Sequence, residues 1–187
     1  MEKKEAMRSP SPWTIVTMAL LLAACTEAGS PTHTAPQPAP FVEFDTVFIE
    51  QSGCLFDCPV FELEIFSDGR VRHSGPAFER TGGPHESRID RRGLTQIAKA
   101  LRDARLDDMR NSYQDEKDGC ESRMTDLSTL SFLINRDQGR HTKSVILYAG
   151  CLGTTVPTER INALIKAIDQ VTGTEALLAQ RKKAGRS

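Results

Sequence analysis

Residues 59–75 read PVFELEIFSDGRVRHSG, and this stretch decides the fold. The apolar residues of its first half alternate with glutamates, so that an extended chain has one apolar face and one charged face. Period-two alternation is typical of a half-buried β-strand. An Asp68-Gly69 pair follows, which favours a tight type I′ turn, and residues 70–74 predict the returning strand. The segment therefore predicts an antiparallel hairpin.

Further strands are predicted on both sides of this hairpin. Residues 42–51 are rich in Val, Phe, Ile and Thr and predict a first strand before it. A short extended segment at residues 85–89 predicts an edge strand after it. Residues 127–135 and 142–148 predict two more strands, joined by a polar turn that contains glycine.

Two stretches carry the helical period instead. Apolar residues recur at positions i, i+3, i+4 and i+7 in residues 91–104, and Asp90 is placed to cap the first turn. The same spacing returns from Ile161 to Ile168, ahead of Gly173, a residue type that commonly ends helices. Together the patterns predict an α+β fold: an antiparallel meandering sheet with two helices, in the order β-β-β-α-β-β-α.

The N-terminus has the features of an export signal. Three basic side chains lie within the first eight residues, and an uncharged stretch at residues 13–22 follows. That stretch is too short to span a bilayer comfortably, since a spanning helix needs about 20 apolar residues. Leu-Ala-Ala then leads into Cys25, which resembles the lipobox of bacterial lipoproteins. We expect residues 1–24 to be a lipoprotein signal peptide and Cys25 to be lipidated; an ordinary signal cut nearby is the alternative.

The rest of the chain divides by composition. Residues 25–40 hold four prolines among Thr, Ala and Gly, cannot bury a core and predict a tether. Residues 41–173 are long enough for one domain, and residues 174–187 predict a solvated, basic C-terminal tail. Because Thr rather than Asp follows Cys25, we expect a lipid-anchored protein of the cell envelope, on the outer membrane and facing the periplasm.

The charge of the mature chain excludes one class of partner. Removal of residues 1–24 leaves 21 Lys and Arg against 23 Asp and Glu, a net charge near −2. Nucleic-acid binding needs a concentrated basic surface. We therefore expect no nucleic-acid partner.

Four cysteines remain after Cys25, namely Cys54, Cys58, Cys120 and Cys151. An even number of cysteines in an oxidising compartment indicates two disulfides. Four cysteines allow three pairings, of which local geometry favours Cys54–Cys58 and Cys120–Cys151. A structural role for both bonds is the first interpretation.

The second pairing follows from the predicted last hairpin. If Asn135 pairs with His141, Cys151 lies opposite about residue 125. Cys120 is five residues away, in a segment that is able to fold back to it.

The Cys54–Cys58 segment also supports an alternative. A Cys-x-x-x-Cys-Pro motif in an exported protein resembles the copper site of the thioredoxin-like copper chaperones of cytochrome oxidase assembly. Two thiolates favour Cu(I), with His73 or His141 as a nitrogen ligand. In that family a helix follows the motif, whereas here a strand is predicted. A copper-binding or thiol-redox protein using Cys54 and Cys58 is therefore the alternative function.

The same segment resembles the start of a bacterial domain-of-unknown-function family, number 6438, whose members begin with a strand, a Cys-x-Gly-x-Cys-Pro-x-Tyr motif and an alternating strand with an Asp-Gly turn. The matching positions are Cys54, Phe56, Cys58, Pro59, Phe61, Asp68-Gly69, Val71 and Gly75. Phe56 stands where the family has Gly, and Phe61 where it has Tyr. The resemblance covers most of residues 41–172 and implies a fold and an envelope location, without an activity.

The sequence lacks the common catalytic motifs, including a Gly-x-Ser-x-Gly elbow, a His-Glu-x-x-His pair and a phosphate loop. His85, which follows Gly82-Gly83-Pro84, is a functional candidate carried only by weak evidence, that of a single loop histidine. The acidic pairs at residues 107–108 and 115–116 are interpreted as solvated side chains. We predict no catalytic residue, cofactor or metal. The expected function is a non-catalytic binding or structural module, attached to the membrane by its N-terminal lipid and contacting an envelope protein or polymer.

Overall fold

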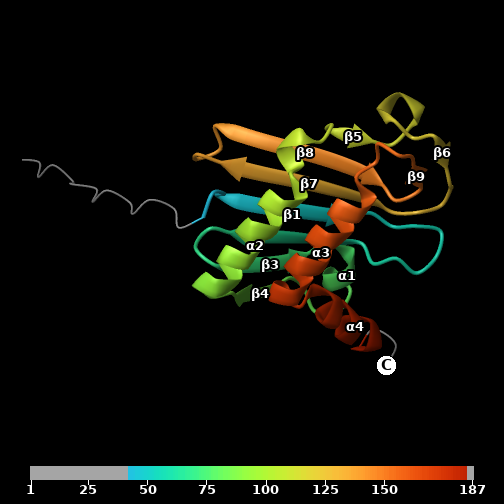
Figure 1. The fold of residues 1–187 in the computed structure, drawn as a ribbon. Coiled ribbons are helices and arrows are strands. Elements are labelled where there is room, and N and C mark those ends of the chain that lie inside the picture. The colour runs from blue at the N-terminus through green and yellow to red at the C-terminus, as the bar shows by residue number, and fades with distance from the viewer. Residues whose placement is uncertain (1–41, 185–187) are drawn as a thin grey trace, which may run out of the picture. The chain divides into compact units, whose positions relative to one another are not determined.

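The centre of the molecule is a seven-stranded sheet in the order β4-β3-β2-β1-β7-β8-β5 (Figure 1). The computed structural model describes residues 42–184. Neighbouring strands are antiparallel except β5, which runs parallel to β8, and β6 pairs with β9 in a separate two-stranded ribbon. The strands are β1 (Thr46–Gln51), β2 (Phe61–Phe66), β3 (Arg70–Ser74), β4 (His85–Arg88), β5 (Ser112–Tyr113), β6 (Ser122–Arg123), β7 (Thr129–Arg136), β8 (His141–Tyr148) and β9 (Cys151–Leu152).

Two long helices cover one face of this sheet (Figure 1). The helices are α1 (Pro76–Glu79), α2 (Arg91–Ala104), α3 (Thr158–Thr172) and α4 (Thr174–Ala184). The covering pair is α2 and α3. The α+β class is confirmed, but residues 42–184 contain four helices rather than two, and three further short strands make the predicted order wrong.

The hairpin of β2 and β3 follows the predicted alternation. Phe61, Leu63 and Ile65 are buried, and the intervening glutamates are not. The predicted type I′ turn is wrong: three residues connect the strands, and only Gly69 has a positive φ, at 87°. A type I′ turn needs a positive φ at both central residues.

Gly69 is required by both its backbone and its surroundings. A Cβ at this position would lie 2.5 Å from the carbonyl oxygen of Ile89, on a backbone that other L-residues rarely adopt. We expect Gly69→Ala to lower the free energy of unfolding by about 2 kcal/mol, measured by urea denaturation. Gly139→Ala is the control, because Gly139 also has a positive φ but open space around it. Equal losses in both variants would contradict the steric explanation.

Helix α2 has the predicted bounds and cap. The Asp90 side chain accepts a hydrogen bond from the backbone N–H of Gly93 at 2.8 Å, which satisfies one of the free donors of the first turn. The side chains of Leu94, Ile97 and Leu101 are buried against the sheet. The period-3.6 pattern therefore identified both the helix and its buried face.

The C-terminal segment differs from its prediction. Gly173 ends α3 in the left-handed conformation, as predicted, but the chain continues as α4 rather than as a solvated tail. Thr174 is buried, and its Oγ1 lies 2.9 Å from Nε2 of the buried His73. Leu177 and Leu178 pack against the core. These contacts hold α4, which is weakly amphipathic and therefore gave no clear period in the sequence.

The pairing of the last hairpin and the start of the first strand also differ from the prediction. The last hairpin pairs Arg136 with His141, one residue away from the predicted pairing of Asn135 with His141. The first strand begins at Thr46 rather than at residue 42. The predicted edge strand is confirmed as β4, which pairs with β3.

Candidate functional site

Two disulfide bonds lie at the same end of the sheet, where β1 ends and β7 begins. Cys54 is bonded to Cys58 and Cys120 to Cys151, with Cα–Cα distances of 5.6 and 5.0 Å. Cys120 and Cys151 are buried within the core, whereas Cys54 and Cys58 are partly exposed. The two bonds therefore differ in surroundings: one lies in the core, and the other closes a surface loop.

The loop closed by Cys54 and Cys58 presents two apolar side chains to solvent. Leu55 is 68% exposed and Phe56 is 77% exposed. The backbone N–H of Leu55 donates to the carbonyl oxygen of Asp126 at 3.1 Å, and Asp57 forms an ion pair with Lys182 of α4. The five-residue ring and these two contacts hold the apolar pair outward.

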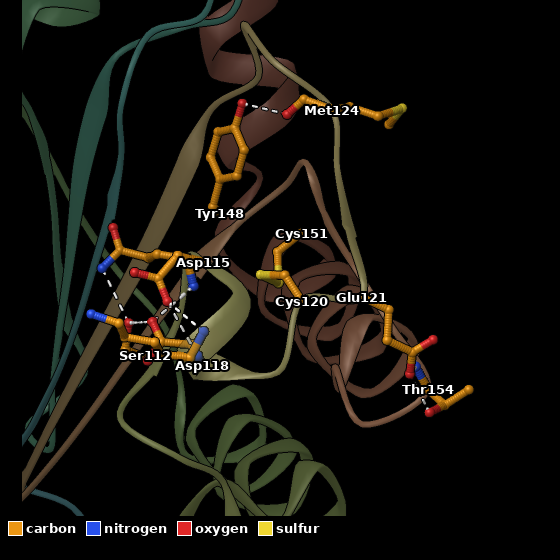
Figure 2. The surroundings of a disulfide bond; sticks show 11 residues. Ser112, Asp115, Asp118, Cys120, Glu121, Met124, Tyr148, Cys151 and Thr154 are labelled. Carbon is orange, nitrogen blue, oxygen red and sulfur yellow. Dashed lines mark hydrogen bonds between the residues drawn. A yellow bond between two sulfur atoms is a disulfide. The ribbon is translucent and has the colours of Figure 1, made fainter.

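The second disulfide joins the segment just before β6 to β9, and so closes the two-stranded ribbon (Figure 2). Arg123 pairs with Cys151 in this ribbon, and Ser122 pairs with Leu152. Successive side chains of a strand point to opposite faces, so Cys151 faces the core while Leu152 is on the outer face; Met124 directly follows β6. Met124 is 50% exposed and Leu152 is 40% exposed.

Tyr148 fixes the segment that leads from the ribbon to β7. Its hydroxyl donates to the carbonyl oxygen of Met124 at 2.8 Å, and the guanidinium of Arg123 lies 4.8 Å from the centre of its ring. Figure 2 shows the Met124 side chain pointing away from Tyr148. The backbone is thus held by Tyr148 while the thioether faces solvent.

Four exposed side chains lie at this end of the sheet, and we call this region the apolar end: Leu55, Phe56, Met124 and Leu152. They are the four exposed large apolar side chains of residues 42–184. Two lie in the ring of one disulfide, and two lie on the ribbon held by the other. Exposed apolar side chains that gather on one surface, rather than being scattered singly, mark an interaction site.

A pocket with a volume of about 350 Å³ opens beside the loop, between β1, β2, α3 and α4. Its floor is formed by Ile49, Phe61 and Leu63, and Pro59, next to Cys58, lies at its rim. Lys166 and Asp169 of α3 lie at its edge. The pocket gives the apolar end a concave neighbour of largely apolar character.

The histidines proposed as copper ligands do not lie with Cys54 and Cys58. His73 is fully buried and bonded to Thr174. His141 is exposed at the opposite end of the sheet, near Asp137. Within the part of the chain that the structure describes, three or more His, Cys, Asp or Glu residues nowhere gather in a way that would hold a metal ion.

The other candidate residues lie on the edge strand, outside the described residues, or in the segment that precedes β6. His85 is on the edge strand β4, where it pairs with His73. Cys25 and the segment at residues 25–40 lie outside the described residues. Asp115, from the acidic pair at residues 115–116, caps a short helical turn by accepting from the backbone N–H of Lys117 at 2.9 Å.

Sequence reasoning missed the apolar end itself. The signal in the sequence was the Leu-Phe pair inside a ring too short to bury it, flanked by Gly53 and Asp57. Met124 and Leu152 gave no comparable signal, because their exposure depends on how the two-residue strands β6 and β9 pair and on the segment that follows β6.

The partly exposed bond should open first under a mild reductant. Thiol–disulfide exchange needs access of a thiolate to a sulfur atom, and Cys120 and Cys151 are buried. We expect dithiothreitol to expose Cys54 and Cys58 to alkylation while the other pair stays closed, as measured by peptide mass spectrometry. Circular dichroism should stay native, because residues 52–60 supply no buried core residue. Simultaneous opening of both bonds would contradict this difference.

The fold and this end define a disulfide-bonded α+β domain with an exposed apolar surface at one end of its sheet. The chain belongs to the family described as Domain of unknown function (DUF6438), which matches residues 45–172. None of the curated proteins matches the chain.

Proposed function

We propose that this protein is a non-catalytic, lipid-anchored module of the cell envelope that binds a partner protein through the apolar end. The gathering of the exposed large apolar side chains of residues 42–184 at one end supports the binding role. Interface centres are enriched in aromatic residues and Met and depleted in charge. An exposed Phe on a short closed ring loses little conformational entropy when it is buried by a partner.

Lipid anchoring is the second part of the proposal, and it is supported by the signal-like N-terminus and Cys25. No helix among residues 42–184 is long and apolar enough to cross a membrane. We expect wild-type protein to sediment with membranes and Cys25→Ser protein to lose its acyl chains, measured by palmitate labelling and fractionation. Labelling that persists in Cys25→Ser would refute acylation at this residue.

The binding role is tested by purifying the protein from detergent-solubilised envelopes, without cross-linker, and identifying the proteins that co-purify with it. The variant is the double substitution Leu55→Ser and Phe56→Ser, and the control is Gln96→Ser on the exposed face of α2. We expect one protein to co-purify with the wild type and with Gln96→Ser and to be lost with the double variant. Because both replaced side chains are solvent-exposed, the double variant should retain its fold, which circular dichroism verifies. Retention of the same protein by the folded double variant would refute the proposal.

A further inference from the structure

We propose that the partner of the apolar end is a protein or peptide segment that combines apolar and basic side chains. This inference rests on the proposed binding role of that end and names the chemistry of its partner. The exposed apolar residues mark the surface, and the charges around them determine what is able to cover it.

The segments that build this end are acidic. Residues 52–60, 114–128 and 149–156, together with Arg110 beside Asp118 and Lys182 beside Asp57, contain six carboxylates against four basic side chains, a net charge of −2. The carboxylates are those of Asp57, Asp115, Glu116, Asp118, Glu121 and Asp126, and the basic side chains are those of Arg110, Lys117, Arg123 and Lys182. The segments around the apolar residues therefore carry a net negative charge.

Hydrogen bonds keep part of this charge in its ionised form. The Ser112 hydroxyl donates to Asp118, and the backbone N–H of Gln114 donates to the same carboxylate, which lowers its pKa. Thr154 donates to Glu121 from its hydroxyl and from its backbone N–H at 2.8 Å, which lowers the pKa of Glu121. Figure 2 shows these carboxylates on either side of the Cys120–Cys151 bond.

Two of these basic groups are already engaged within the protein. The Arg123 guanidinium lies over the ring of Tyr148, and Lys182 is paired with Asp57. A partner therefore meets an apolar centre with an acidic surround. Complementary potentials across an interface favour association, and like charges oppose it.

This surround disfavours the other materials of an envelope. Anionic lipid headgroups and anionic polymers would bring like charge against the carboxylates. A segment with apolar side chains for Leu55 and Phe56 and basic side chains for the surrounding carboxylates satisfies both features. The occupant is thus a basic, apolar-bearing protein segment rather than a lipid surface.

The test measures peptide binding to the soluble chain of residues 26–187 by fluorescence anisotropy. One labelled peptide alternates Leu with Lys, and a matched peptide alternates Leu with Glu. We expect the Lys peptide to bind, to weaken about tenfold with Phe56→Ser, and to weaken in ~0.5 M salt. The Glu peptide should not bind.

Charge variants provide the matched control. Glu116→Gln with Asp126→Asn should weaken the Lys peptide by about threefold, whereas Glu86→Gln on the distant strand β4 should leave it unchanged. Asn accepts the positive φ of 66° at position 126, so that variant keeps its backbone.

Equal or tighter binding of the Glu peptide, or sedimentation with phosphatidylglycerol vesicles, would overturn the inference. The Lys peptide fails to bind in one outcome, while a protein still co-purifies in a manner that depends on Leu55 and Phe56. That result would refute the inference of a basic partner and would leave the proposed binding role supported. If the double substitution changes neither peptide binding nor co-purification, both the basic partner and the binding role of the apolar end are refuted.

Discussion

Replacing Cys120 and Cys151 by alanine is expected to lower the free energy of unfolding by about 4 kcal/mol. The bond closes a loop with a sequence separation of 31 residues, and the unfolded chain gains conformational entropy when the loop is released. Both cysteines are also in the core, at 6% and 1% exposure. Urea denaturation of the variant under oxidising conditions measures the loss.

The Cys54–Cys58 bond provides the comparison. Its sequence separation is only 4, so the same entropy argument gives about 2 kcal/mol for Cys54→Ala with Cys58→Ala. The double variant that lacks the buried Cys120–Cys151 bond should therefore lose more free energy of unfolding. A loss that is equal in the two double variants, or larger for the exposed loop, would contradict the assignment of Cys120–Cys151 as the bond that stabilises the fold.

Acidification is expected to destabilise the domain by about 3 kcal/mol through His73. The pKa of His73 is lowered from 6.5 to about 4, mainly by burial and also by the charge of His85, while a hydrogen bond with the His85 backbone and the charge of Asp169 act in the opposite direction. The unfolded chain therefore binds this proton first as the pH falls. The stabilising contribution is complete above pH 6.5 and is lost as the pH falls toward 4.

Denaturation at pH 7.5 and pH 4.5 tests this dependence by comparing two variants. His73→Leu should show a smaller loss on acidification than the wild type, because no proton is taken up at that position. His141→Gln should behave like the wild type, since His141 is exposed near Asp137 at the other end of the sheet. An unchanged pH dependence in His73→Leu would show that other groups account for the acid sensitivity.

The elements with a strong period were predictable from the sequence. The alternation in β2 and the apolar stripe of α2 each placed one face against the same core, so the α+β class followed. Short elements were not predictable: β5, β6 and β9 have two residues each, and their pairing depends on neighbours far along the chain. Helix α4 likewise depends on Thr174 meeting His73, which lies 101 residues earlier.

The candidate site was predictable only in part. The count of cysteines indicated two disulfides, and both bonds are present in the structure. The sequence did not reveal that the exposed loop would contact residue 126 or that Met124 and Leu152 would share its end of the sheet. Those positions follow from the register of β1 with β7 and of β6 with β9, which local patterns do not determine.

Photo-cross-linking in living cells tests the binding surface most directly. A photoreactive phenylalanine analogue is introduced singly at positions 55, 56, 124 and 152, and at the exposed control positions 86 and 96. If the apolar end binds the partner, adducts of the same protein form from the first four positions and not from the controls. Adducts that form equally from the controls, or only from them, would contradict the account.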